Sequence, residues 1–257
     1  MAGSVPRRGA GRLGGPAPAA VREALGPVAR TRFEHPVPNQ LWQMDFKGAV
    51  PPPVTGPAHP LTILDDLSCF NVWLQVLPNH QTATVRQALH ETFRRYGLPD
   101  RMLVDNGSPW GSDATHQNTP LTAWLWRVGV AVTHSRPYHP QTLGKDERFH
   151  GTLTREVPRH AQWRDPVHLQ TALDRWREIY NQERPHDALG LADPASRYQP
   201  SLRSYQEVLP PIEYATGTLV RKVQQQGEFS FQGRTYKLSK AFRGYPVGVP
   251  VSGGRPV

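Results

Sequence analysis

Acidic residues stand at three places where folding could bring them together. Asp45 lies inside the apolar run LWQMDFKGAV, Asp105 closes the run RMLVD, and Glu147 lies near the start of a predicted helix. An aspartate within a strand needs a partner or a metal ion if it is buried, and needs neither on a solvated face. Asp-Asn-Gly is also a good turn, so Asp105 has a purely structural explanation. Because carboxylates suit hard cations, all three are candidate metal ligands.

Asp146 and Glu147 are adjacent in the helix predicted over 144–157, and helical geometry directs them to different faces. A helix turns about 100° per residue, so with Glu147 at zero Asp146 falls at roughly 260°. The apolar residues of this helix form one stripe at roughly 200°, 240° and 280°, namely Phe149, Leu153 and Val157. Asp146 therefore lies above the stripe, in the first turn, where a carboxylate meets the helix dipole favourably. Glu147 lies on an open face and is the better metal ligand of the two.

The elements that must position these acids follow from the apolar periodicity. Predicted strands cover 41–50, 61–68, 71–78, 101–105 and 130–135, and predicted helices cover 81–97, 121–129, 144–157 and 167–182. The first three strands follow one another closely enough to be antiparallel, and the later ones alternate with helices. This order predicts an α/β fold with a mixed sheet flanked by helices.

Composition divides the chain into three predicted parts. Residues 1–35 are a basic arm rich in Gly, Pro and Ala, which we expect to be mostly disordered. Residues 36–200 hold the α/β core with its trailing helix. Residues 201–257 hold a linker and a small β-rich, barrel-like domain, because GEFSFQGRTYKL alternates around the turn Gln232-Gly233.

The charge balance and the cysteine content narrow the classes of function. The 257 residues carry a net charge of +9, which favours a polyanionic partner such as nucleic acid. Cys69 is the only cysteine, so a disulfide framework and a thiolate zinc cluster are excluded. No apolar run reaches the ~20 residues of a membrane span. We therefore expect a cytoplasmic protein with no membrane partner.

Four motifs together resemble a known family. WQMDF, VDNGSPWGS, HPQTLGKDERFHGTLTREV and YNQERPHDALGLADPASRY occur in the order found in the retroviral-type integrase catalytic core, which bacterial insertion-sequence transposases share. The resemblance covers about 35–200 and implies a ribonuclease-H-like fold. It also implies that Asp45, Asp105 and Glu147 are the catalytic, metal-binding acids. The family pattern Q-x-x-G-x-x-E-R is matched by Gln141, Gly144, Glu147 and Arg148.

The resemblance implies metal-dependent DNA cleavage and strand transfer. Two Mg²⁺ or Mn²⁺ ions are expected as cofactors, with DNA ends and target DNA as partners, a homo-oligomer that joins two ends, and a location at the bacterial nucleoid. The predicted DNA contacts are Tyr138, His139, Gln141, Lys145, Arg148 and Arg155. The arginines among them could instead be solvated or paired with nearby acids.

Two departures from the family keep other readings open. Residues 112–120 look like a surface insertion, and 1–35 are too short for the helix-turn-helix region that usually precedes such a core. A truncated or frame-shifted product is therefore expected, and one alternative is an inactive remnant that binds DNA or a partner transposase. A second alternative is a nuclease that only hydrolyses. A third is a zinc site, with His134, His139 and His150 as the potential ligands.

Overall fold

The computed structural model describes residues 36–48, 57–111, 118–135, 144–157, 163–249, 251–252 and 255–256. These residues fall within one compact unit, and the predicted arm at 1–35 lies outside the described residues. No helix in the described ranges is long and apolar enough to cross a membrane.

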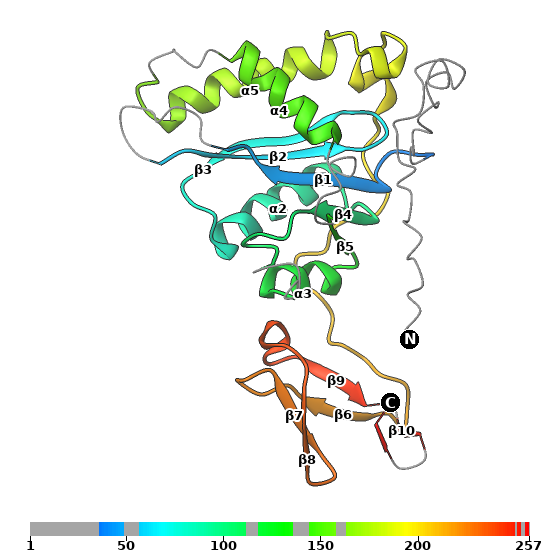
Figure 1. Ribbon diagram of the computed structural model, residues 1–257. Coiled ribbons are helices and arrows are strands. Elements are labelled where there is room, and N and C mark those ends of the chain that lie inside the picture. Colours follow the sequence, from blue (N-terminus) through cyan, green and yellow to red (C-terminus); the bar gives the residue numbers. More distant parts are fainter. Residues whose placement is uncertain are drawn as a thin grey trace, which may run out of the picture. The chain divides into compact units, whose positions relative to one another are not determined.

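A five-stranded mixed sheet forms the centre of the core (Figure 1). Its strands are β1 (Leu41–Phe46), β2 (His59–Asp65), β3 (Asn71–Leu77), β4 (Arg101–Val104) and β5 (Ala131–His134). The spatial order is β3-β2-β1-β4-β5, with β1, β2 and β3 antiparallel and β1, β4 and β5 parallel. The predicted mixed sheet is confirmed, and every described strand is shorter at its C-terminal end than the sequence pattern suggested.

Four helices cover the two faces of the sheet (Figure 1). They are α2 (Thr82–Tyr96), α3 (Pro120–Arg127), α4 (Gly144–Glu156) and α5 (Pro166–Gln182). Residues of α2 and α3 share one apolar cluster with the sheet, and residues of α4 and α5 share a second cluster on the opposite face. Gly97 ends α2 with a φ of 75°, a conformation that favours glycine. Thr119 begins α3 through a reciprocal capping box.

Strand β1 has one apolar face and one polar face. Trp42 and Met44 are fully buried in the cluster formed with α2 and α3. Because side chains alternate along a strand, Gln43 and Asp45 project toward the other face, where α4 packs. The alternation in WQMD therefore directs the Asp45 carboxylate to the α4 side of the sheet.

The C-terminal residues form short antiparallel strands, as predicted. The pairs are β6 (Leu219–Lys222) with β9 (Pro246–Val249), β7 (Glu228–Phe231) with β8 (Arg234–Lys237), and β10 (Val251–Ser252) with β11 (Arg255–Pro256). Gln232 and Gly233, at φ of 48° and 71°, form the turn of the predicted hairpin. The boundary predicted at residue 200 stays a prediction.

A candidate metal site on strand β1

Asp45 is the acid on which the negative charges of the other two predicted acids act. Its side chain is 29% exposed, and Oδ1 accepts a hydrogen bond of 2.8 Å from the backbone N–H of Phe46. Burial is the main cause that raises the pKa of Asp45 to about 6, and the negative charges of Asp105 and, more weakly, Glu147 raise it further. The hydrogen bond from Phe46 acts in the opposite direction. Both of the other predicted acids are therefore close enough to repel Asp45 electrostatically.

Asp105 follows the neighbouring parallel strand β4. The parallel pairing runs from Leu41 with Arg101 to Gln43 with Leu103, and Asp45 and Asp105 each follow this paired stretch by two residues. Asp105 Oδ1 accepts a hydrogen bond of 3.0 Å from the backbone N–H of Gly107. A Cβ atom at Gly107 would lie 3.2 Å from Asp105 Oδ2, so a side chain at that position would crowd the carboxylate.

The two acids at the start of α4 have opposite environments. Glu147 is exposed, on the open face that the helical geometry predicts, and its charge contributes to raising the pKa of Asp45 and of Asp146. Asp146 is in the first turn, as expected, but only 1% of its surface is exposed. Burial, followed by the charge of Asp45, holds the pKa of Asp146 well above its ordinary value.

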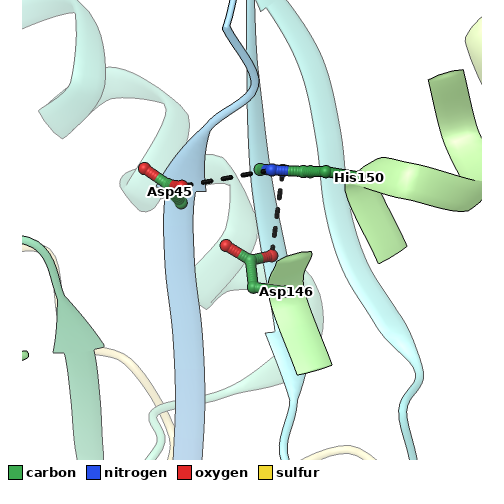
Figure 2. Close-up of side chains that lie close together, drawn as sticks. All are labelled: Asp45, Asp146 and His150. Carbon is green, nitrogen blue, oxygen red and sulfur yellow. Dashed lines mark ion pairs between the residues drawn. The ribbon is translucent and has the colours of Figure 1, made fainter. Parts of the chain in front are cut away.

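Asp146 packs against β1 and β2 together with a histidine one helical turn further along (Figure 2). His150 Nε2 lies 3.8 Å from Asp146 Oδ1, and His150 Nδ1 lies 4.0 Å from Asp45 Oδ2. The potential ligand atoms of Asp45, Asp146 and His150 all lie within 4.8 Å of one another. Burial and the nearby positive charge of Lys47 lower the pKa of His150 to about 4, so its imidazole is neutral at pH 7.

Sequence reasoning missed this second group of residues around Asp45. Thr62, which is fully buried on β2, completes it, with Oγ1 2.8 Å from His150 Nε2. One signal was present, because an acid on the apolar side of α4 and a histidine four residues later must share a buried face. The partner on β2 is 88 residues from His150 in sequence. Only the packing of α4 on the sheet brings them together.

The predicted DNA contacts have different surroundings. Tyr138, His139 and Gln141 lie outside the described residues. Lys145 Nζ lies 3.2 Å from Asp66 Oδ2 and also donates to the Asp66 carbonyl, so its charge is partly neutralised within the protein. Arg148 and Arg155 are exposed on α4, and their hydrogen bonds go to Gly144 O and Thr152 Oγ1 of the same helix. Their role in DNA binding stays a prediction.

The three histidines of the zinc alternative have no common site in the described ranges. His134 Nδ1 lies 2.9 Å from the carbonyl oxygen of Asp105, whereas His150 lies near Thr62. His139 lies outside the described residues. The trio of potential ligands found in the described part of the chain includes His150 and excludes His134.

Two integrase core domain families match residues 35–140 and 128–194. The C-terminal domain of the IS481 family transposases matches residues 218–252. The two integrase core matches together span residues 35–194, so the chain carries an integrase core domain, followed by a segment similar to the C-terminal domain of IS481 family transposases.

Individual relatives agree with this family. The chain is 26% identical over 160 residues to the insertion element IS407 uncharacterized 31.7 kDa protein of Burkholderia multivorans, covering 62% of this chain and 54% of that one. It is 30% identical over 132 residues to the Gag-Pol polyprotein of feline leukemia virus, covering 50% of this chain and 7% of the polyprotein. The chain thus spans less than two thirds of the length of either relative.

A solved structure supports the fold. A chain in the cryo-EM structure of the simian T-cell lymphotropic virus intasome, in complex with PP2A regulatory subunit B56 gamma, matches 84% of this chain. The match covers 70% of that chain at 15% identity, with a TM-score of 0.50. The fold of the described core is the integrase catalytic core, which is ribonuclease-H-like.

Proposed function

We propose that this chain is a metal-dependent polynucleotidyl transferase that cuts DNA strands and joins them to a target. The observation that supports this most directly is that the negative charges of Asp105 and Glu147 act on Asp45 within an integrase core. Burial is the main cause of the raised pKa of Asp45, and the negative charges of Asp105 and, more weakly, Glu147 act in the same direction. Such a set of acids is relieved when a divalent cation binds among them.

The donor set fits Mg²⁺ or Mn²⁺. Asp45, Asp105 and Glu147 would hold the cations through carboxylate oxygens, the ligands that these hard ions prefer. Two ions are expected, and these three acids would supply ligands to them. When bound, they neutralise charge at the scissile phosphate and make a water or hydroxyl oxygen more nucleophilic.

The proposed reaction exchanges one phosphodiester bond for another. Water attacks a phosphorus atom at the element end, and the 3′ oxygen departs as a free 3′-OH. That hydroxyl then attacks a phosphorus atom of the target strand, and the target's own 3′ oxygen departs in turn. No external energy source is needed, because each step that follows the hydrolysis conserves the number of phosphodiester bonds.

DNA is the proposed partner, and the surface beside Glu147 would hold its backbone. Arg148 and Arg155 are exposed on the same helix, and the chain carries a net charge of +9. Cationic side chains bind phosphates without reading sequence, which suits a site that must accept varied target DNA. We further propose that the protein acts as a homo-oligomer on DNA in the bacterial cytoplasm, because two element ends must be joined.

The test combines purified protein, Mn²⁺ and duplexes made from the DNA that flanks its gene. We expect 3′-end cleavage and joined products, and loss of both in Asp45→Asn. Cleavage without joined products would favour a nuclease. DNA binding without any cleavage would favour the inactive remnant. Activity of the wild-type level in Asp45→Asn would exclude the proposed site.

A further inference from the structure

His150 lies between two carboxylates of unequal exposure. Its side chain is 15% exposed, Asp45 on one side is 29% exposed, and Asp146 on the other side is 1% exposed. Figure 2 shows the imidazole directed from α4 toward β1, with one dashed contact to each acid. The ring therefore occupies the space that borders the carboxylate on which the proposed site depends.

A buried hydroxyl fixes the orientation of this ring. Thr62 pairs directly opposite Asp45 in the β1–β2 ladder, and its Oγ1 lies 2.8 Å from His150 Nε2. The same oxygen lies 3.0 Å from the backbone carbonyl of Asp45 and 3.4 Å from Asp146 Oδ1. Because Thr62 is fully buried, solvent does not compete for the hydroxyl.

The geometry of His150 favours a role in positioning a metal ligand over a role as a metal ligand itself. The two ring nitrogens face different carboxylates, at 4.0 Å and 3.8 Å, and one metal ion can take only one of those nitrogens. Nε2 is already in contact with the Thr62 hydroxyl. The Thr62 hydroxyl donates to the backbone carbonyl of Asp45 at 3.0 Å, so its oxygen can accept a hydrogen bond from a proton on His150 Nε2 at 2.8 Å.

We propose that His150 is a positioning residue that holds the Asp45 carboxylate in the orientation required for metal binding, with Thr62 fixing the imidazole. At 4.0 Å the contact is too long for a hydrogen bond, so the ring acts by closing one side of the space open to Asp45. This role rests on the proposed function, since it assumes that Asp45 binds a divalent cation. Residues that orient metal ligands affect metal affinity without touching the ion.

The test measures Mn²⁺ affinity directly, by electron spin resonance of the full chain without DNA. We expect His150→Ala to weaken binding by about 10- to 100-fold. Thr62→Val, which removes the hydroxyl and keeps the shape, should also weaken Mn²⁺ binding. Thr62→Ser, which keeps the hydroxyl, should bind Mn²⁺ as the wild type does. Thr92→Val is the matched control, because Thr92 is a fully buried threonine of α2 whose hydroxyl bonds only to its own helix, at Ala88 O.

Three outcomes would overturn the proposal. Mn²⁺ affinity within twofold of wild type in both His150→Ala and Thr62→Val would remove the positioning role. A loss of affinity equal in Thr92→Val would show that any buried hydroxyl has this effect. A nitrogen coupling in the spin-echo spectrum of bound Mn²⁺, absent from His150→Ala, would make His150 a direct ligand. A wild-type chain that binds Mn²⁺ through Asp45 but joins no DNA would contradict the proposed function alone.

Discussion

Two adjacent acids on α4 show how one residue of sequence changes a carboxylate's chemistry. Glu147 is exposed, and its negative charge contributes to raising the pKa of Asp45. Asp146 is buried, and its Oδ2 has no hydrogen-bond partner within the described part of the chain. A buried carboxyl in such surroundings is more stable with its proton than without it. We therefore propose Glu147, the exposed acid, as the metal ligand of the two.

Substitution of each acid by its amide separates these roles. We predict that Glu147→Gln lowers metal-dependent cleavage by about a hundredfold or more, because a lost metal ligand costs several kcal/mol of transition-state stabilisation. Asp146→Asn resembles the protonated form and should lower cleavage by less than about tenfold. The measurement is the single-turnover rate at saturating Mn²⁺. A larger loss in Asp146→Asn than in Glu147→Gln would reverse the assignment.

At the scale of elements, α5 protects an edge of the sheet. Strand β3 is the outermost strand, and an uncovered edge presents unpaired backbone groups. Asn181 accepts a hydrogen bond of 2.8 Å from the N–H of Asn71 and donates one of 3.0 Å to the carbonyl of the same residue. Gln170 bonds in the same way to Val76 N and Leu74 O. The helix side chains thus substitute for a missing sixth strand.

Asn181→Ala tests this protection. The substitution leaves the N–H of Asn71 unpaired in a site where both residues are at most 3% exposed, so we predict a loss of about 1–3 kcal/mol in the free energy of unfolding. Gln182→Ala, at the next and exposed position of α5, is the control and should change stability by less than about 0.5 kcal/mol. Urea unfolding measures both, and equal effects would exclude a specific role for the edge contact.

Glu156 of α4 accepts a hydrogen bond from Trp176 of α5, and its contacts predict how stability depends on pH. Burial acts to raise the pKa of Glu156, but hydrogen bonds from Arg184 and Trp176 outweigh it, and the pKa is lowered. A carboxyl with a lowered folded-state pKa stabilises the fold above its unfolded pKa, and this contribution is lost as pH falls through the folded pKa.

Glu156→Gln should therefore destabilise the protein at pH 7 and make no difference at low pH. Because the Glu156 side chain is 37% exposed, the expected cost is at most about 1 kcal/mol. Thermal unfolding of both chains from pH 7 to pH 3 measures the difference. A gap that stays constant as pH falls below about 4.5 would contradict this assignment.

On the scale of the whole molecule, the segment after the core is part of its packing. Tyr198 stacks on Phe70 with ring centroids 4.2 Å apart, and Tyr205 lies 5.6 Å from Phe93. The backbone N–H of Leu98 donates to the carbonyl of Arg203 at 2.8 Å. The residues just beyond 200, predicted as a linker, are therefore held against the α2 face of the sheet.

Tyr205→Ala measures this packing. Loss of the partly buried ring should lower the free energy of unfolding by roughly 1–3 kcal/mol, which corresponds to several degrees in Tm. Leu202→Ala is the control in the same segment, because Leu202 is 102% exposed and has no packing to lose. Equal Tm values for the two variants would show that the segment contributes nothing to the core.

Local patterns in the sequence predicted the elements, and the alternation along β1 sets Asp45 on the face opposite Trp42 and Met44. Period-2 alternation in WQMDF and the apolar stripe of 144–157 are local patterns, and they set which side chains turn inward wherever the elements pack. The hairpin turn at Gln232-Gly233 is equally local. These features agree with the structure because they require only neighbours within a few residues.

Which inward side chains meet depends on how the elements pack against one another. The contact between Thr62 and His150 depends on how α4 crosses β1 and β2, and no periodicity spans the 88 residues between them. The same packing buries Asp146, an acid that the sequence marked as a helix-start residue. Burial changes the protonation of a carboxyl because it removes water, and the position of water is a property of the whole fold.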